Sequence, residues 1–338
     1  MNQQLFSHDI FQYLDEESKR FVLKYMPALT VTADTILVKQ ESAIDNLFII
    51  TEGEAHVIRA LPGNHSTDVA LISKGDLFGD LAFIDRGVAS ASVVTKTRLH
   101  YVTLSVTTCR FFQEHHPAIY ASFIKGYTQH CYARLKRLFN LLDPLVKRVS
   151  QKDQVDYNLS TLPRVEFSSA TSIQHLSGDC GIDHAIKIFE MELLAKKTRE
   201  LLLESARVQC VDDAALLHMA QEDCCCQFAL LKGALQLTRH VENISTQFDV
   251  VAPGAMFSFC YDKFQHHSMY DIFVRDSAVV LMWEDIPDSL LADLHVTCYL
   301  ASRNLLSVIR WLRRGQNKLL RLHCEMNKPY INQGGGYV

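Results

Sequence analysis

The sequence lacks the short motifs that mark the common enzyme classes. Its 338 residues contain no Walker A loop, no H-E-x-x-H run and no C-x-x-C pair, and no serine, histidine and aspartate follow the order of a known triad. Asp80 lies in a motif discussed below, but no second acid or base is placed to work with it. The sequence therefore predicts a protein without catalytic residues and without a metal site.

A strong excess of charge and a long apolar run are also missing. The 34 basic and 38 acidic residues give a formal net charge of −4, which offers no overall basic field for nucleic acid. No stretch approaches the ~20 apolar residues that a membrane span needs, and the N-terminal residues mix charges with apolar side chains. We expect a cytoplasmic protein with no membrane contact, whose 10 cysteines are reduced thiols.

The chain is long enough for two domains, and its periodicity changes along its length. Residues 5–26 have helical spacing, residues 29–102 carry short β-branched runs separated by turn residues, and residues 117–142 return to helical spacing. Residues 151–181 are polar and read as a linker, and a second helical stretch starts near Ile182. The strand runs lie at 29–31, 35–38, 47–50, 55–58, 68–72, 92–94 and 99–102.

An internal repeat relates the two halves of the chain. A shift of 180 residues places Thr35 on Ala215, Phe48 on Phe228 and Gly53 on Gly233, and after one lost residue a shift of 179 holds. The second shift places the following residues on one another: Gly75 on Gly254, Phe78 on Phe257, Val93 on Ile272 and Tyr120 on Tyr299. A period this long predicts a duplicated domain.

The first half resembles the cyclic-nucleotide-binding domain family, which includes catabolite activators, protein kinase A regulatory subunits and cyclic-nucleotide-gated channels. The resemblance rests on three runs of the sequence: KQESAIDNLFII (39–50), KGDLFGDLAF (74–83) and ASVVTKT (91–97). It implies a mixed α+β fold of two jelly-roll-like β-rolls with flanking helices, the second copy being degenerate. We place the first domain at 1–145, a linker at 146–181, the second domain at 182–325 and a tail at 326–338.

The resemblance also implies where a ligand would bind. In the family a short helix offers backbone N–H groups to a phosphate, an acidic residue accepts from the ribose hydroxyl, and an Arg about nine residues later pairs with the phosphate. Here Asp80 replaces the usual Glu, and the Arg position falls on Ala89. The candidate ligand-binding residues are Phe78, Gly79, Asp80, Leu81, Ala82, Arg86, Ala89, Ser90 and Ser92.

The missing arginine weakens the expected site. Ser90 and Ser92 bring no charge, and Arg86 would reach the phosphate only after the loop rearranges. Losing a buried cation that pairs with a phosphate costs roughly 2–5 kcal/mol, which is about 30-fold to several-thousand-fold in affinity. In the second copy Ser258, Phe259 and Ser268 stand at the positions of the glycine, the acid and the arginine. We therefore expect cyclic mononucleotides to bind weakly or not at all.

Three further clusters are better explained without a ligand. Cys224–Cys226 fall on a turn and have no ligand spacing around them, and the pairs His115-His116 and His266-His267 belong to surface turns. The basic run on the last helix reads as a solvated face or a protein contact, since the 18 residues after Leu320 are too few for a winged-helix DNA-binding module. That run consists of Arg303, Arg310, Arg313, Arg314 and Lys318.

These observations favour a regulatory or scaffold protein that acts through protein contacts. We expect association, with a protein partner or with itself, through the helices at 117–142 and 299–320, where Phe123, Tyr127, Cys131, Leu135, Leu138 and Phe139 form an apolar stripe. The stripe is equally compatible with an ordinary core face. The alternative function is a receptor for a cyclic nucleotide or another nucleotide messenger in the first domain. A catabolite-activator-type transcription regulator is disfavoured, and no cofactor is expected beyond that possible ligand.

Overall fold

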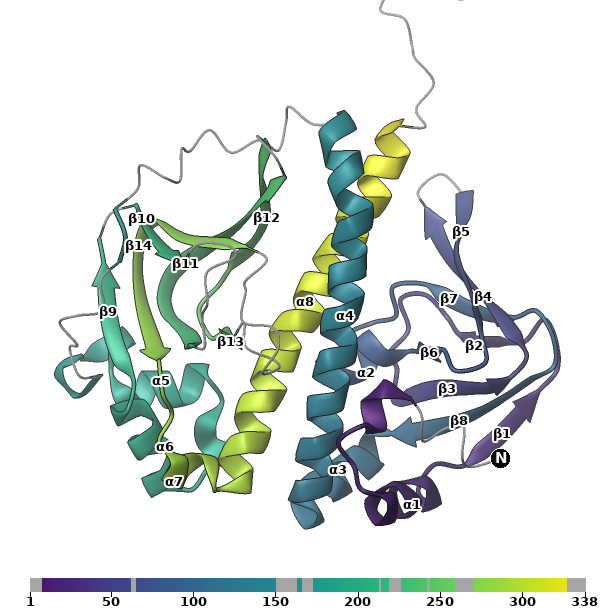
Figure 1. Ribbon diagram of the computed structural model, residues 1–338, viewed down its shortest axis with the longest axis horizontal. Helices are drawn as coiled ribbons and strands as arrows, with labels where there is room; N and C mark the ends of the chain where they lie inside the picture. The colour runs from purple at the N-terminus through teal and green to yellow at the C-terminus, as the bar shows by residue number, and fades with distance from the viewer. Residues whose placement is uncertain are drawn as a thin grey trace, which may run out of the picture. The chain divides into compact units, whose positions relative to one another are not determined.

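The computed structural model describes residues 8–61, 65–149, 163–165, 173–212, 214–218, 226–241, 244–258 and 270–326 (Figure 1). The chain divides into two compact units. Unit 1 comprises residues 1–130 and 289–309, and unit 2 comprises residues 131–288 and 310–338. The domain boundaries expected from the sequence follow the repeat along the chain and stay predictions.

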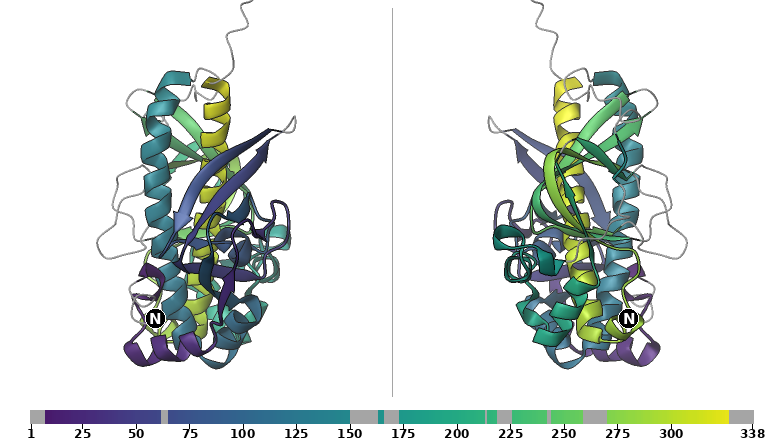
Figure 2. Two further views of the ribbon diagram at one scale, coloured as in Figure 1. Left: turned by 90° about the vertical axis from the view of Figure 1, so that its right-hand side faces the viewer. Right: turned by 90° about the vertical axis from the view of Figure 1, so that its left-hand side faces the viewer.

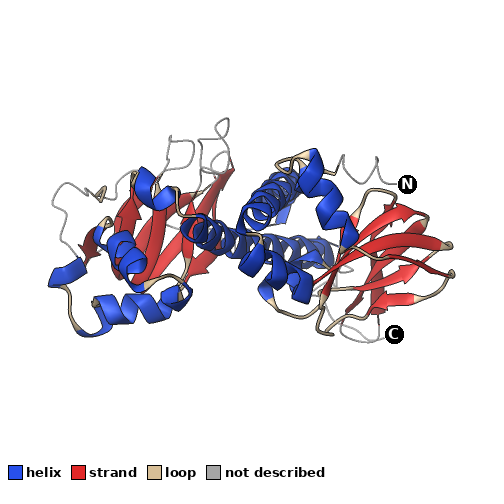
Figure 3. Ribbon diagram, turned by 90° about the horizontal axis from the view of Figure 1, so that it is seen from below, coloured by secondary structure: helices blue, strands red, loops and turns tan. Residues whose placement is uncertain are grey.

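Unit 1 contains a β-roll made of two antiparallel four-stranded sheets. The sheet orders are β1-β8-β3-β6 and β2-β7-β4-β5, and Figure 3 shows these strands curled together beside the helices. The strands are β1 (Ala28–Val31), β2 (Ile36–Val38), β3 (Asn46–Glu52), β4 (Glu54–Leu61), β5 (His65–Ser73), β6 (Leu77–Phe78), β7 (Ser92–Thr95) and β8 (Leu99–Ser105). The left view of Figure 2 shows β4 and β5 side by side as an extended pair. Every expected strand run of the first half is confirmed, and so is the β-roll fold.

The helices of unit 1 begin where side chains cap them. The Asp15 carboxylate accepts from Ser18 N–H at the start of α1 (Glu16–Lys24), and the Ser105 hydroxyl accepts from Thr108 N–H at the start of α3 (Val106–His115). The cap at Asp15 explains why the helix expected over 5–26 is divided into η2 (Asp9–Phe11) and α1. Two further helices are the short α2 (Asp80–Asp85) and the long α4 (Pro117–Val149), of which residues 117–130 belong to unit 1.

Unit 2 repeats the strand plan of unit 1 in longer, bent strands. Its six-stranded sheet has the order β10-β14-β11-β12, with β9 on β14 and β13 on β11. Its strands are β9 (Arg207–Val211), β10 (Ala215–His218), β11 (Gln227–Val241), β12 (Ile244–Val251), β13 (Met256–Ser258) and β14 (Asp271–Trp283). By the repeat, β11 covers the positions of β3 with β4, and β14 covers those of β7 with β8. Among the helical elements of unit 2 are η4 (Ile173–His175), η5 (Gly178–Cys180), α5 (Ile182–Ile188), η6 (Met191–Leu193) and α6 (Lys196–Glu204).

The repeat extends to individual hydrogen bonds. In unit 1, Gly75 N–H donates to the Ile50 carbonyl at 2.8 Å, and Ile50 N–H donates to the Asp76 carbonyl at 3.0 Å. The same pair recurs in unit 2 between Leu230 and residues 254–255, at 2.9 and 3.0 Å. The aromatic pairs Phe48–Phe78 and Phe228–Phe257 are both stacked. The described residues thus confirm the expected offset.

The glycine before β4 has a steric role that is repeated in unit 2. Gly53 has φ +94°, and a Cβ there would lie 2.4 Å from the Arg98 carbonyl oxygen. Gly233 has φ +87°, and its Cβ would lie 2.0 Å from the Ser277 carbonyl oxygen. The strand pair can cross this closely only because neither residue has a side chain.

The long helices exceed the lengths that the sequence predicts. α4 continues beyond residue 142 to Val149 with Pro144 inside it. α8 (Leu294–Met326), which follows the short α7 (Asp288–Leu291), starts before the expected residue 299. Pro144 removes one backbone donor, but the surrounding turns are held by side chains. Within unit 2, Asp143 accepts a bidentate bond from Arg239, and Val146 is buried. These tertiary contacts outweigh the local helix-breaking tendency of the proline.

The apolar stripe on α4 is core. Its side chains are at most 7% exposed: Phe123, Tyr127, Cys131, Leu135, Leu138 and Phe139. In unit 1 the Phe123 ring lies 6.3 Å from that of Phe11, and in unit 2 the Phe139 ring lies 5.0 Å from that of Phe248. The stripe thus packs as the ordinary core face that the sequence also allowed, and it leaves almost no free surface in this chain. Self-association through other residues of the helices stays a prediction.

A buried carboxylate fixes the basic run of α8 within unit 2. Asp249 on β12 is 4% exposed and accepts from Arg310 Nε at 2.8 Å, while Arg314 Nε lies 3.5 Å from its other oxygen. Arg310 and Lys318 also donate to the Val250 and Gln247 carbonyls of β12. Three of the five basic side chains thus serve the fold, which leaves less of the run for nucleic acid.

Replacing Gly53 by alanine should destabilise the protein more than replacing Gly75. The Gly53→Ala variant should lose at least about 3 kcal/mol of unfolding free energy, because backbone strain and a clash with a carbonyl act together. Gly75 has a similar φ of +88° but no atom within 4 Å of a Cβ, so Gly75→Ala should lose about 1–2 kcal/mol. Urea denaturation measures both. Equal losses of unfolding free energy in the two variants would show that the close approach of Gly53 to the Arg98 carbonyl does not destabilise Gly53→Ala.

Neutralising Asp249 should also destabilise the protein. We expect Asp249→Asn to lose about 2–4 kcal/mol, somewhat less than a fully buried pair because the Arg310 side chain is 37% exposed. The control is Arg207→Gln, which breaks an ion pair to Glu284 whose side chains are both 45% exposed and should cost at most about 1 kcal/mol. A loss for Asp249→Asn no greater than the control would contradict the assignment. Chemical denaturation monitored by circular dichroism gives both values.

Candidate functional site

The candidate site of unit 1 centres on a segment that we call the cassette, residues 77–85, in which β6 leads into the short helix α2. Gly79 caps that helix with φ +73°, and a Cβ there would lie 3.0 Å from both the Asn46 carbonyl oxygen and the Phe48 ring. Phe48 in turn stacks on Phe78 with 4.7 Å between ring centroids. The glycine therefore lets the chain turn closely over β3 and start α2 at a fixed place.

The helix α2 presents mainly apolar side chains to the interior. Leu81, Ala82 and Phe83 are at most 6% exposed, and Phe83 N–H donates to the Gly79 carbonyl at 3.0 Å. Burial of these side chains holds the helix against the roll by the hydrophobic effect, at roughly 1.5–3 kcal/mol for each large side chain. The cassette is a packed part of the core as well as a candidate binding element.

The carboxylate of the cassette is bonded to α4. Asp80 is 5% exposed, and the hydroxyl of the fully buried Tyr127 donates to its Oδ2 at 3.0 Å. A buried carboxylate that lacks a donor is costly, so this charge-assisted bond stabilises the closed arrangement of α2 on α4. In the family comparison, Asp80 stands where a ligand hydroxyl would be accepted; here a tyrosine hydroxyl is already bonded to it.

A buried alanine occupies the position where the family has an arginine that pairs with the phosphate. Ala89 is 6% exposed, its N–H donates to the Ser42 carbonyl, and its carbonyl accepts from Glu41 N–H. Its backbone is thus tied to the β2–β3 connection, and its methyl group supplies no charge. Of the candidate residues, only Arg86 is cationic.

Arg86 lies near α3. Its guanidinium carbon is 5.9 Å from the centre of the Phe83 ring, and its backbone has φ +55° at the end of α2. Burial raises the pKa of the Cys109 thiol on α3 to about 12, and the nearby charge of Arg86 opposes that rise. The thiol therefore stays protonated at neutral pH and is no nucleophile. The loop rearrangement that would bring Arg86 to a phosphate is not present.

The two serines beside Ala89 differ in their use. The Ser92 hydroxyl accepts from Gln40 N–H at 2.9 Å, which ties β7 to the residues after β2. Ser90 is partly exposed. The structure thus brings together Phe78, Gly79, Asp80, Leu81 and Ala82 in the cassette, with Ala89 and Ser92 on the neighbouring connection. Arg86, the one cationic candidate residue, lies beside Phe83 and not beside Ala89.

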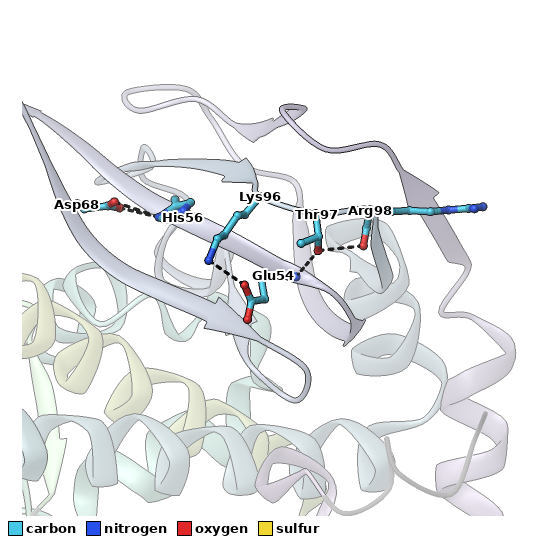
Figure 4. A network of polar contacts seen from close by, with 6 residues as sticks. All are labelled: Glu54, His56, Asp68, Lys96, Thr97 and Arg98. Atoms are coloured by element: carbon cyan, nitrogen blue, oxygen red, sulfur yellow. Dashed lines mark hydrogen bonds and ion pairs between the residues drawn. The ribbon is translucent and has the colours of Figure 1, made fainter.

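Charged side chains of the roll gather instead on the other face of the sheet β2-β7-β4-β5. Figure 4 shows Lys96 reaching Glu54 and His56 reaching Asp68, at 3.1 and 3.0 Å. Neighbouring strand positions with the opposite orientation, such as Ala55 and Val93, are buried. The polar pairs therefore lie on the solvent face and are separate from the cassette.

In the second copy only part of the equivalent segment is described. Ser258 ends β13, is 7% exposed and pairs with Gln227 of β11. Phe259 and Ser268, which stand at the positions of the acid and the arginine, lie outside the described residues, as do His266, His267, Cys224 and Cys225. Cys226 is described and is partly buried just before β11.

Two further expectations concern metals and membranes. Within the residues that the structure describes, no group of three or more His, Cys, Asp or Glu side chains could hold a metal ion. No helix within those ranges is both long enough and apolar enough to cross a bilayer. His115 and His116 contact Phe111 and Phe21 through their rings and form no ligand set.

The functional role that sequence reasoning missed is that of Tyr127. The helical period assigned it correctly to the buried stripe but said nothing about its hydroxyl. A signal was present, because a buried tyrosine hydroxyl usually needs a hydrogen-bond partner and the cassette holds a carboxylate. Only the three-dimensional arrangement, in which Figure 1 shows α2 against α4, identifies that partner.

The family model and the known proteins that resemble this chain match only part of it. Residues 28–115 match the model of the cyclic nucleotide-binding domain. The chain is 30% identical over 99 residues to a cAMP-dependent protein kinase regulatory subunit of Schizosaccharomyces pombe, covering 29% of this chain and 23% of that protein. A regulatory subunit of Dictyostelium discoideum is 27% identical over 110 residues, covering 32% and 34% respectively. The match thus spans about a quarter to a third of these relatives.

Two solved structures align with this chain over different lengths. The regulatory domain of Toxoplasma gondii PKA with cAMP aligns over 87% of this chain and 92% of its own, with 15% identity and a TM-score of 0.32. A cyclic nucleotide-binding domain from Methylobacillus flagellatus aligns over 45% and 84%, with 21% identity and a TM-score of 0.40. Unit 1, whose β-roll and cassette lie within residues 28–115, thus contains a domain of the cyclic nucleotide-binding type.

Proposed function

We propose that this chain is a non-catalytic regulatory protein that acts through protein contacts and does not depend on a cyclic nucleotide. The proposal rests mainly on Ala89. This buried, uncharged residue occupies the position where the family has an arginine that pairs with the phosphate. The names of the curated relatives, regulatory subunits of a protein kinase, support a regulatory role without catalysis. The domain fold is retained while the charge that would hold a cyclic phosphate is absent.

The electrostatics of the cassette support this proposal. A cyclic phosphate would bring one negative charge beside Asp80, which already carries one when ionised. In the family geometry an arginine offsets that charge with a bidentate pair, and its loss costs roughly 2–5 kcal/mol. The alanine methyl offers no compensation, and Arg86 lies beside Phe83. Binding of a cyclic mononucleotide should therefore be weaker than about 10 μM, where an intact site binds about 30-fold to several-thousand-fold more tightly.

The receptor alternative has one observation in its favour. Gly79 and the Asp80 carboxylate are retained, and they would suit a hydroxyl-bearing ligand that carries no phosphate charge. The bond from Tyr127 to Asp80 argues against it, because that ligand would have to displace a buried partner. We therefore rank protein-contact action first and treat a bound nucleotide as an outcome of the test.

Calorimetry of the purified chain with cyclic AMP and cyclic GMP tests the proposal. We expect no binding tighter than about 10 μM for either ligand, because Ala89 brings no charge and the Arg86 guanidinium lies beside Phe83. The Ala89→Arg variant should bind more tightly than the native chain, since it restores the missing charge. The matched control is Ala91→Arg, which adds the same charge two residues away.

A sub-micromolar dissociation constant for the native chain would overturn the proposal and favour the receptor function. In that case Arg86→Ala should abolish binding if Arg86 supplies the missing charge. Action through protein contacts is tested with a protein kinase A catalytic subunit as the partner. Interferometry measures its binding to this chain with and without cyclic AMP. Binding that is unchanged by the nucleotide agrees with the proposal; release by the nucleotide contradicts it.

A further inference from the structure

The Tyr127–Asp80 bond joins two side chains of unit 1 that are each at least 95% buried. Asp80 is 5% exposed at the first position of α2, and Tyr127 is fully buried in the first half of α4. The two residues are 47 positions apart in the sequence, and the oxygen atoms are 3.0 Å apart. A contact of this kind fixes one element on another, because either group loses its partner when the elements separate.

The direction of the bond limits what it can do. An ionised carboxylate only accepts hydrogen bonds, while a tyrosine hydroxyl can donate. The bond therefore uses an acceptor site of Asp80 that a hydroxyl group from a ligand would otherwise use. Rings on α4 hold the tyrosine in place, since Phe123 and His130 lie 6.1 and 6.3 Å from its ring centre. The donor is thus fixed before any ligand arrives.

The repeat offers an internal comparison. With the offset of 179 that places Tyr120 on Tyr299, Tyr127 corresponds to Leu306 and Asp80 corresponds to Phe259. Both polar partners of the first copy are thus apolar residues in the second. A lone hydroxyl or a lone carboxylate in the core would be penalised, whereas replacing both partners avoids the penalty. At neither position does the second copy carry a polar side chain that would need a partner.

We propose that Tyr127 is an internal substitute for a ligand hydroxyl and latches α2 to α4 in the absence of any ligand. The inference rests on the proposed function, in which no cyclic nucleotide is needed to close the cassette. The inference also names the group that holds the cassette on α4, the Tyr127 hydroxyl, and the class of ligand that this group excludes from Asp80. That class is a neutral molecule with sugar hydroxyls, which reaches Asp80 only by displacing Tyr127.

A double-mutant cycle tests the latch. Tyr127→Phe should raise amide hydrogen exchange in residues 80–85 about tenfold, because the carboxylate loses a donor. Asp80→Leu should lower the denaturation midpoint. Combining the two changes should recover part of the loss, since an apolar pair then replaces a polar pair.

The matched control is Tyr120→Phe. Tyr120 lies on the same helix, is partly buried, and its hydroxyl is 3.4 Å from the Ser302 hydroxyl, not from the cassette. It removes the same atom and should leave exchange in residues 80–85 unchanged. Additive effects of Tyr127→Phe and Asp80→Leu, or equal exchange in the two tyrosine variants, would overturn the latch.

The exclusion of ligands is tested separately with adenosine and 2′-deoxyadenosine. Tyr127→Phe should bind adenosine at least about tenfold more tightly than the native chain does, with a smaller gain for the deoxy compound. Equal affinity in the two proteins, including undetectable binding by both, would refute the exclusion. Cyclic AMP binding to the native chain decides the proposed function, so failure of one idea is distinguishable from failure of the other.

Discussion

The position of the cassette depends on two backbone hydrogen bonds between Ile50 and the turn at residues 75–76. They hold the turn against β3 and thereby set where β6 ends and α2 begins. Gly79 can then pass within contact distance of Asn46 and Phe48, and Asp80 is delivered to α4. Because backbone groups make these bonds, the side chains of the cassette can change while its path is conserved. The same two bonds recur between Leu230 and residues 254–255, so the turn itself is held in the same way in unit 2.

The backbone of the cassette is thus fixed independently of its side chains. The roll keeps its turn, its helix and its buried phenylalanines, which serve packing as much as binding. Residue 89, where the family resemblance implies a cation, is a buried alanine. The carboxylate at residue 80 has become a structural acceptor for α4. The cassette is thus held to α4 by a polar bond, while the residue at position 89 contributes only a methyl group.

The fold could be predicted from the sequence to a large extent. Short β-branched runs identified the strands of the first copy, and the offset between Gly53 and Gly233 identified the second, because tight crossings require glycine wherever the strand plan recurs. The cassette residues were located by motif. Helix ends were less predictable: the apolar period suggested that α4 ends near residue 142, but the bond from Arg239 and the burial of Val146 stabilise further turns. The side-chain partners of Asp80 and Asp249 lie 47 and 61 residues away, and no local pattern encodes such pairs.

The pairing of Asp249 with Arg310 also bears on how the protein is made. β12 is synthesised well before residues 310–314, so its carboxylate leaves the ribosome without the cations that later neutralise it. Unit 1 likewise joins residues 1–130 with residues 289–309. Each unit therefore reaches its final packing only when the last long helix has emerged, although its strands can pair earlier. During translation both units therefore expose, for a time, the surfaces that residues 289–326 later cover, and a chaperone that shields apolar surface would be most useful in that period.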